Sequence, residues 1–216
     1  MDRITLAGVI PAALSEPVPG CQSDIWGRIL SFDKGRSVLI RAASGHGKTT
    51  LCCFLSGLRS DYSGTISFDG RNIRLLDDSG WSDVRCRQLA VMYQDLKLMD
   101  ELSAVDNILL KTALCPGCRL QDITDMLKRL GIDDATMKRP VNTLSLGQQQ
   151  RVAFVRMLVQ PAQIRVLDEP VSHLDPENAS IMAAMLEETC SKDGSAVIVT
   201  STGYDLPYRY DRTIQM

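Results

Sequence analysis

The sequence contains no long hydrophobic run. Nowhere in its 216 residues does it approach the roughly 18 consecutive apolar residues that a membrane-spanning helix needs. The segment Met1–Thr5 lacks a basic start followed by an apolar core, so no signal peptide is expected. We therefore expect a protein that is soluble by itself and cytoplasmic.

Neither sign of charge is in excess. Lysine and arginine total 24 against 26 aspartate and glutamate, which gives a formal net charge of −2. This balance gives no electrostatic reason to expect a nucleic-acid partner. The sequence also lacks internal repeats and low-complexity segments. Its length suits one large domain, or one domain with a small lobe.

The seven cysteines form neither a disulfide framework nor a metal-binding set. Their number is odd and their positions are scattered. Cys52 and Cys53 lie on the apolar face of a predicted helix, so we expect reduced thiols in the core. Cys115 and Cys118 form a lone C-x-x-C motif without a second pair, which we interpret as a surface loop.

A glycine-rich segment, Ala42–Thr50, organises the rest of the chain. It follows the apolar run Ser37–Ile40 and precedes the apolar run Leu51–Leu55. That order predicts a buried strand, a turn and a helix, which is the layout of a phosphate-binding loop. Gly45 and Gly47 allow backbone N–H groups to converge on phosphate oxygens. The positive end of the helix points at the same anion.

Two side chains of this segment are suited to a nucleotide and its metal. Lys48 supplies a positive charge for the β- and γ-phosphates, and the Thr49 hydroxyl is a ligand for Mg²⁺. Ala42 stands where the usual pattern has glycine, which is tolerated if its φ is negative but predicts a stiffer loop. The residues of this loop expected to contact the nucleotide are Ser44, Gly45, His46, Gly47, Lys48, Thr49 and Thr50.

Two carboxylates follow a buried strand further along. Within Val166–Pro170, Asp168 and Glu169 lie at the C-terminal end of the buried strand, where α/β sheets place their ligand sites. Asp168 can hold the Mg²⁺ shell, and Glu169 can act as general base toward a water molecule. Without the upstream loop, an ordinary Asp-Glu turn after a core strand would explain these residues equally well.

A second helix start is also suited to an anion. In Leu144–Arg151, Ser145 and Gly147 open a helix that is predicted to run to Val159. An ordinary capped helix is the alternative, but three consecutive glutamines before Arg151 argue against it.

Strands and helices alternate along most of the chain, which predicts an α/β fold with a mainly parallel sheet covered on both faces. Residues 95–160 show no strand signal and are expected to form an inserted helical lobe. Strands are expected at Ile4–Leu6, Trp26–Phe32, Ser37–Ile40, Ser63–Gly70, Ala90–Tyr93, Gln163–Leu167, Ala196–Thr200 and Thr213–Ile214. Besides the helix ending at Val159, helices are expected at Lys48–Leu58, Trp81–Leu89, Ala104–Leu110 and Leu120–Leu130, and from Pro176.

Together these motifs give the chain a clear family resemblance. Over about residues 35–202 it resembles the nucleotide-binding subunits of ABC transporters. Its compact length and its Tyr-Gln-Asp-x-x-Leu-Met region are most similar to the small lipoprotein-releasing, macrolide-exporting and cell-division types. The matching stretches, in family order, are Ala42–Thr50, Gln94 with its neighbours Tyr93 and Asp95, Leu144–Arg151, Ile164–Glu169 and Ser172–Asp175.

The resemblance implies the ABC ATPase fold, in which a P-loop NTPase core is joined by an antiparallel β subdomain and a helical lobe. Residues 1–216 would form a single domain, with a core of about 1–94 and 160–216 and a lobe of about 95–160. It also implies ATP and Mg²⁺ as cofactors. Glu169 and Gln94 would be catalytic, and Thr49, Gln94 and Asp168 would hold the metal.

The resemblance further implies two partners. Two subunits, in a homodimer or a heterodimer, would sandwich two ATP molecules. Ser145, Gly147 and Gln148 of one copy would then contact the ATP held by the other copy. The second partner would be a separate transmembrane permease on the cytoplasmic face of the inner membrane. Its coupling helix would dock near Gln94 and the 95–130 part of the lobe.

Three positions depart from the family pattern. Leu146 replaces a signature glycine, and it would be strained if that backbone requires φ above zero. Ser201, which we assign to the catalytic set, replaces the switch histidine. No aromatic residue stands near Ser15–Pro19, where the family stacks adenine, and Trp26 is a poor substitute by spacing.

The departures leave alternatives open. One hypothesis is that His173 faces the dimer seam and partly replaces the switch histidine, whereas we favour a solvated loop histidine. The chain as a whole is expected to be an ATPase, with a weakly hydrolysing, nucleotide-dependent binding or regulatory module as the alternative. A DNA-repair or translation ATPase of the same superfamily is disfavoured, since 216 residues leave no room for long coiled-coil inserts or tandem domains.

Overall fold

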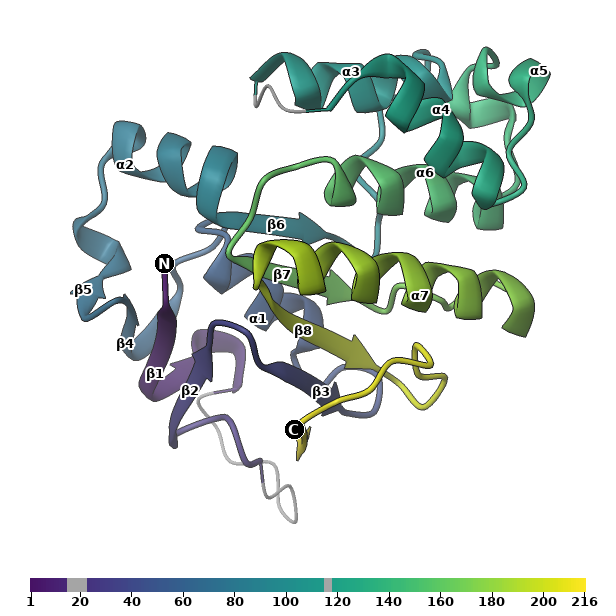
Figure 1. The fold of residues 1–216 in the computed structure, drawn as a ribbon. Coiled ribbons are helices and arrows are strands. Elements are labelled where there is room, and N and C mark those ends of the chain that lie inside the picture. The colour runs from purple at the N-terminus through teal and green to yellow at the C-terminus, as the bar shows by residue number, and fades with distance from the viewer. Residues whose placement is uncertain (15–22, 115–117) are drawn as a thin grey trace.

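The computed structural model describes residues 1–14, 23–114 and 118–216. A five-stranded parallel sheet forms its centre (Figure 1), in the order β6-β7-β8-β3-β9. The strands are β3 (Ser37–Arg41), β6 (Leu89–Met92), β7 (Ile164–Asp168), β8 (Ala196–Ser201) and β9 (Arg212–Gln215). The predicted α/β class and mainly parallel sheet are confirmed.

Alternate residues of these strands enter two different cores. In β3, Val38 and Ile40 face one cluster of buried side chains and Leu39 faces the other. In β7, Val166 and Leu167 divide in the same way. Both faces of the sheet are therefore covered, as the apolar strands predict.

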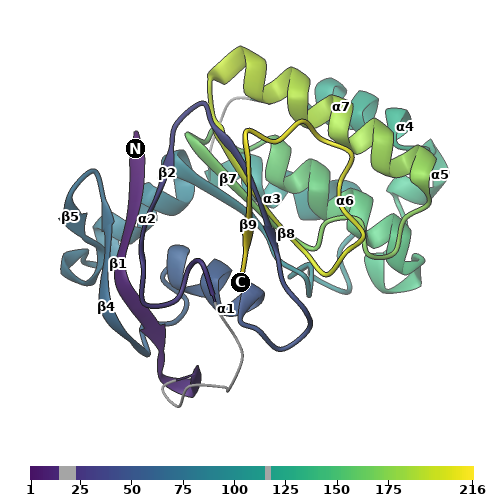
Figure 2. The same ribbon diagram turned by 90° about the horizontal axis from the view of Figure 1, so that it is seen from below.

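One core lies between the parallel sheet and a second, antiparallel sheet. Helix α1 (Lys48–Leu55) fills the space between the two sheets with Leu51, Phe54 and Leu55 (Figure 2). The antiparallel sheet has the order β2-β1-β4-β5. Its strands are β1 (Arg3–Pro11), β2 (Ile29–Asp33), β4 (Tyr62–Phe68) and β5 (Arg71–Asn72). The turn between β4 and β5 is the predicted Asp-Gly turn, with positive φ at Asp69 and Gly70.

The other core is covered by helices. Helix α7 (Pro176–Asp193) and helix α6 (Leu146–Leu158) cover this face of the sheet, and α3 and α4 pack on α6 (Figure 1). The remaining helices of the lobe are α3 (Ala104–Leu114), α4 (Leu120–Arg129) and α5 (Asp134–Met137). The described part of residues 95–160 contains no strand beyond an isolated bridge between Ser103 and Pro140. Single 3₁₀ turns lie at Ala12–Leu14, Ile73–Leu75 and Val141–Thr143.

The structure differs from the sequence prediction mainly at element ends. Helix α1 ends at Leu55 because the chain turns at Gly57, whose φ is +68°. The helix predicted at Trp81–Leu89 is instead α2 (Asp78–Asp83) followed by a π-helical turn at Val84–Gln88. The side chain of Asp77 caps α2 by accepting a hydrogen bond from Gly80 N at 2.8 Å.

The cysteines also differ in part from the prediction. Cys52, Cys53, Cys118 and Cys190 carry free thiols, and burial raises the pKa of the Cys52 thiol well above its usual range. The reduced state expected for Cys52 and Cys53 is confirmed, whereas Cys86 is disulfide-bonded, which the sequence did not predict.

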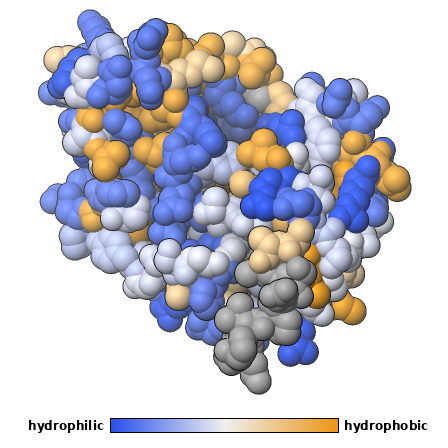
Figure 3. Space-filling view, turned by 180° about the vertical axis from the view of Figure 1, so that it is seen from behind, coloured by the Kyte–Doolittle hydropathy of each residue, from blue (hydrophilic) through white to orange (hydrophobic). Residues whose placement is uncertain are grey.

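The surface opposite to that of Figure 1 is largely hydrophilic, with hydrophobic residues gathered in separate patches (Figure 3). Among the helices of the described residues, none has the length and apolarity to cross a bilayer.

Candidate nucleotide site

The phosphate-loop segment forms the predicted turn into α1. Gly45 and Gly47 have φ values of +83° and +98°, a region that favours glycine. Ala42 does not adopt a positive φ, so alanine is accommodated there without strain. The buried Lys48 ammonium donates hydrogen bonds to Ala42 O (2.9 Å) and Ala43 O (3.0 Å). The lysine charge is thus held inside the loop, where a phosphate would bind.

Trp26 supports this loop from outside. Its indole Nε1 donates a hydrogen bond to His46 O at 3.2 Å. A Cβ at Gly47 would lie only 3.0 Å from a carbon of the indole ring. Gly47 is therefore required both by its φ and by this close approach. The sequence pattern does not identify Trp26 as a support for the loop, because its hydrogen-bond partner lies 20 residues away.

The three predicted metal ligands come together from separate elements. The Thr49 hydroxyl on α1 donates to Asp168 Oδ2 at the end of β7, at 2.7 Å. It also lies 3.2 Å from Oε1 of Gln94, which follows β6. Hydroxyl, carboxylate and amide oxygens are hard ligands of the kind that Mg²⁺ prefers. The residues present therefore fit the predicted metal.

Asp168 is fully buried at the end of β7. Burial raises the pKa of this carboxyl, while hydrogen bonds from the Thr200 and Thr49 hydroxyls act in the opposite direction. The Thr200 hydroxyl on β8 donates to Asp168 Oδ1. Thr200 was not among the predicted site residues, since the hydrogen bond depends on the pairing of β7 with β8.

Glu169 follows directly and turns toward the loop. Its side chain is 12% exposed, and its Oε1 lies 3.3 Å from Lys48 Nζ. The Thr202 hydroxyl lies 3.4 Å from its Oε2. The carboxylate predicted to act as general base therefore pairs with the loop lysine in this structure.

The remaining predicted site residues lie in the phosphate loop and at the end of β8. Ser44 is exposed, and the Thr50 hydroxyl lies 3.4 Å from an Arg59 nitrogen. Ser201 ends β8, where it is buried and its hydroxyl accepts a hydrogen bond from Gly203 N at 3.0 Å. The stacking position expected at Ser15–Pro19 lies outside the described residues.

The predicted signature segment forms the N-terminus of α6. The Ser145 hydroxyl accepts from Gln148 N at 3.2 Å, and Gln148 Oε1 accepts from Ser145 N at 3.0 Å. This reciprocal pair is a capping box. Leu146 is 57% exposed and does not adopt a positive φ, so the strain considered for it is absent.

Gly147 is constrained by packing. A Cβ at this position would lie 2.9 Å from the backbone oxygen of His173. His173 itself is exposed, and its Nδ1 lies 2.9 Å from the Ser172 hydroxyl. Among the described residues, no hydrogen bond or ion pair joins Ser145, Gly147 or Gln148 to the phosphate loop.

Comparison with known proteins gives one consistent family. The sequence model described as ABC transporter matches residues 28–172. The lipoprotein-releasing system ATP-binding protein LolD of Maricaulis maris is 31% identical over 87% of this chain and 83% of its own length. The phosphonates import ATP-binding protein PhnC 2 of Pseudomonas syringae pv. syringae is 35% identical over 84% of this chain and 70% of its own length.

Solved structures agree on the fold. A dimeric structure of MJ0796, a bacterial ABC transporter cassette, superposes with a TM-score of 0.83 at 24% identity. The match covers 99% of this chain and 94% of the other. A post-hydrolysis dimer of the same cassette, bound to ADP and Pi, gives a TM-score of 0.78 over 94% of this chain and 88% of the other, also at 24% identity.

Proposed function

Because this chain belongs to the ABC transporter family, we propose that it binds and hydrolyses ATP and powers a membrane transporter through ATP-dependent dimerisation. The observation that carries the proposal is the meeting of Thr49, Gln94 and Asp168 beside Lys48. Three distant segments converge on one hard-oxygen site at the carboxyl ends of parallel strands, where such sheets bind their ligands.

Different residues of the chain would bind the phosphates, hold the metal and accept the proton. The loop N–H groups and Lys48 would hold the phosphates, and Thr49, Gln94 and Asp168 would hold Mg²⁺. When bound, the metal would neutralise charge on the β- and γ-phosphates. Glu169 would accept a proton from the attacking water at its carboxylate.

The proposal includes a second copy of a nucleotide-binding subunit. The N-terminus of α6 carries Ser145, Gly147 and Gln148, and a helix N-terminus of this kind is suited to an anion. The ATP-binding site is therefore completed only when another subunit supplies these residues. Residues 1–216 act as one domain in this proposal, with the lobe of about 95–160 carrying the signature segment.

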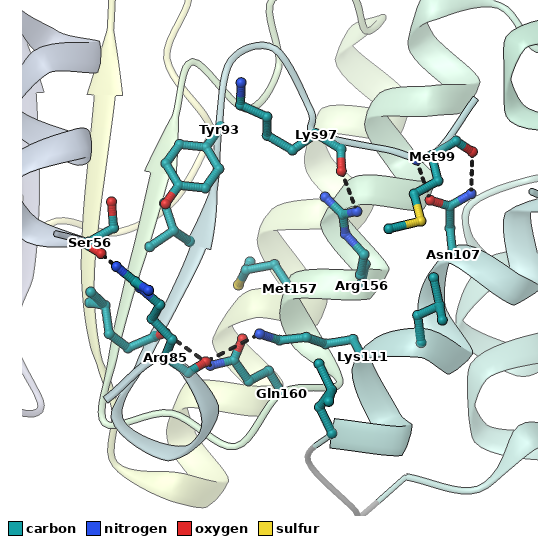
Figure 4. Close-up of a pocket in the computed structure, with 14 residues that line it drawn as sticks. Ser56, Arg85, Tyr93, Lys97, Met99, Asn107, Lys111, Arg156, Met157 and Gln160 are labelled. Atoms are coloured by element: carbon teal, nitrogen blue, oxygen red, sulfur yellow. Dashed lines mark hydrogen bonds between the residues drawn. The ribbon is translucent and has the colours of Figure 1, made fainter. Parts of the chain in front are cut away.

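A permease is the second proposed partner, at the cytoplasmic face of the inner membrane. A groove of about 320 Å³ lies between β6 and helices α3 and α6 (Figure 4). It is lined by Tyr93, directly before Gln94, and burial raises the pKa of Tyr93 to about 12. A permease segment bound in this groove would contact the chain directly before Gln94, a proposed metal ligand.

The positive charge of the groove indicates that it binds an acidic segment of the permease. Arg85, Lys111 and Arg156 line it, and among the described residues none of the three pairs with a carboxylate. Lys111 donates to Arg85 O at 3.2 Å, and its pKa is lowered by burial and by Arg156. A permease segment with an aspartate or glutamate would match these cations.

Arg156 links the groove to the metal site. It donates to Lys97 O at 2.6 Å and to Leu96 O. Leu96 and Lys97 both have positive φ, so the turn after Gln94 is strained and is held by this arginine. An acidic group that attracts Arg156 would loosen that turn and shift Gln94.

The decisive experiment uses Glu169→Gln. We expect the purified variant to bind MgATP like the parent, to release phosphate about 100-fold more slowly or worse, and to accumulate as an ATP-bound dimer on gel filtration. Normal phosphate release by the variant would exclude Glu169 as the base. No MgATP binding by the parent would refute the function itself.

One observation favours the weakly hydrolysing alternative. The Ser201 hydroxyl is buried and already bonded to Gly203 N, so it does not reproduce a switch histidine. Phosphate release by the parent, alone and with its permease, separates a motor subunit from a regulatory module.

A further inference from the structure

Gln150 is a buried polar side chain that the proposed chemistry does not use. It lies on α6, one turn after Gly147, and is 2% exposed. Its Nε2 donates to Glu169 O at 3.1 Å and to the Ser172 hydroxyl at 3.2 Å. Its Oε1 accepts from His173 N at 3.1 Å. One amide therefore joins α6 to three residues of the turn that follows β7.

The backbone of that turn is strained at Glu169, the proposed general base. Glu169 has a φ of +48°, in the left-handed region that side chains other than glycine seldom occupy. Such a conformation persists only where the surroundings fix it. The Glu169 N–H is fixed by Thr200 O at 3.2 Å, and its carbonyl accepts from Gln150 Nε2 and, at the longer distance of 3.4 Å, from Ser172 N.

The same helix contacts the turn a second time. Gly147 packs against His173 O, while Gln150 binds His173 N. Positions three apart on a helix lie on one face, so both contacts come from a single rigid surface. A displacement of the N-terminus of α6 is therefore transmitted to the backbone that carries Glu169.

We propose that Gln150 is a positioning residue that fixes the carboxylate of Glu169 and makes its alignment depend on where the signature end of α6 lies. When a second subunit engages Ser145 and Gly147, the shift of α6 reaches Glu169 through this amide. The inference rests on the proposed function, because it concerns the general base of that reaction.

The test compares Gln150→Met with the parent in steady-state ATP hydrolysis by the purified chain. We expect kcat to fall about tenfold, in line with the loss of buried hydrogen bonds, and KM for MgATP to change less than about twofold. Ser37→Ala is the matched control, because its hydroxyl is also buried and bonds Arg209 O at 3.0 Å and Asp211 N at 2.9 Å at the start of β3, outside both the nucleotide site and the groove. It should lose stability but keep its kcat.

A double-mutant cycle separates positioning from general destabilisation. If Gln150 acts through Glu169, adding Gln150→Met to Glu169→Gln should leave the residual rate unchanged. If Gln150→Met lowers the rate of Glu169→Gln by the same factor as it lowers the rate of the parent, the proposal is overturned. A kcat of Gln150→Met equal to that of the parent would also overturn it. If Gln150→Met fails to fold, Gln150→Glu replaces it in the same double-mutant cycle. The glutamate keeps the acceptor for His173 N and loses the donor to Glu169 O. A parent that hydrolyses no ATP would refute the proposed function instead.

Discussion

At the scale of single residues, the buried carboxylate of Asp168 lowers the free energy of unfolding. Its carboxylate would be ionised to hold the proposed Mg²⁺, yet it is fully buried and burial raises its pKa. Two hydroxyl donors, from Thr49 and Thr200, compensate only in part. Ionisation of Asp168 therefore favours the unfolded chain, and burying this carboxylate lowers the stability of the fold.

We predict that Asp168→Asn raises stability and removes magnesium-dependent nucleotide binding. Because the native pKa is above the unfolded value, the parent loses stability as pH rises from the unfolded pKa through the native one. The asparagine variant lacks that loss, so its thermal midpoint should exceed the parent's at neutral pH. MgATP affinity should fall about tenfold or more. A lower midpoint for the variant at neutral pH would contradict this reading of Asp168.

Motif spacing predicted the residues of the site whose role depends on local sequence. Lys48 and Thr49 follow directly from the glycine-rich turn, and Asp168 follows from its place at a strand end. Trp26 and Gln150 could not be found in this way, because their hydrogen-bond partners lie 20 and 19 residues away on other elements. Only the folded chain brings them to the site.

At the scale of elements, α6 carries two constraints at its start. The capping box of Ser145 and Gln148 fixes where the helix begins. Gly147 then allows the helix to approach the turn at His173 more closely than any other residue would permit. The exposed Leu146 carries neither constraint, so the fold accommodates a large side chain at this position.

We predict that Gly147→Ala disrupts this approach. The added Cβ would meet a backbone oxygen at 2.9 Å, which costs roughly 1–3 kcal/mol of unfolding free energy and should lower kcat. Gly80→Ala in α2 is the matched control, since its Cβ would meet only side-chain atoms, the nearest at 3.1 Å. Chemical denaturation of both variants checks this, and equal stabilities would disprove the packing argument.

Element types were largely predictable from the sequence, whereas some element ends were not. The periodic apolar positions of α4 and the apolar strands correspond to observed elements. The break between α2 and the π-helical turn at Val84–Gln88 was missed, because both segments share one helical pattern. The order of the strands in the parallel sheet also lies beyond any local signal.

At the scale of the whole molecule, the proposed metal site lies between two surfaces. Gln94 lies beside Thr49 on one side and follows the groove residue Tyr93 on the other. The groove lies between the sheet and the helical lobe (Figure 4), so relative movement of the two parts would change its width. Occupancy of the groove and occupancy of the site are therefore expected to be coupled.

We predict that Lys111→Glu weakens attachment to the permease on the order of tenfold or more. The reversed charge would repel the acidic segment proposed for the groove. Lys128→Glu on α4 is the control, since Lys128 lies elsewhere on the lobe and pairs with Asp134 at 2.9 Å. Membrane fractionation of cells should show the first variant released and the second retained. Parent-like retention of Lys111→Glu would exclude the acidic partner.

The indole of Trp26 touches the carbonyl of His46, while the other tryptophan, Trp81, lies apart from the phosphate loop and packs against Gly57 and Phe68. The protein thus contains its own optical label at the point where phosphates would enter. Ultraviolet emission from that ring depends on the local conformation of the loop, so filling and emptying of the pocket can be followed in real time without any attached dye.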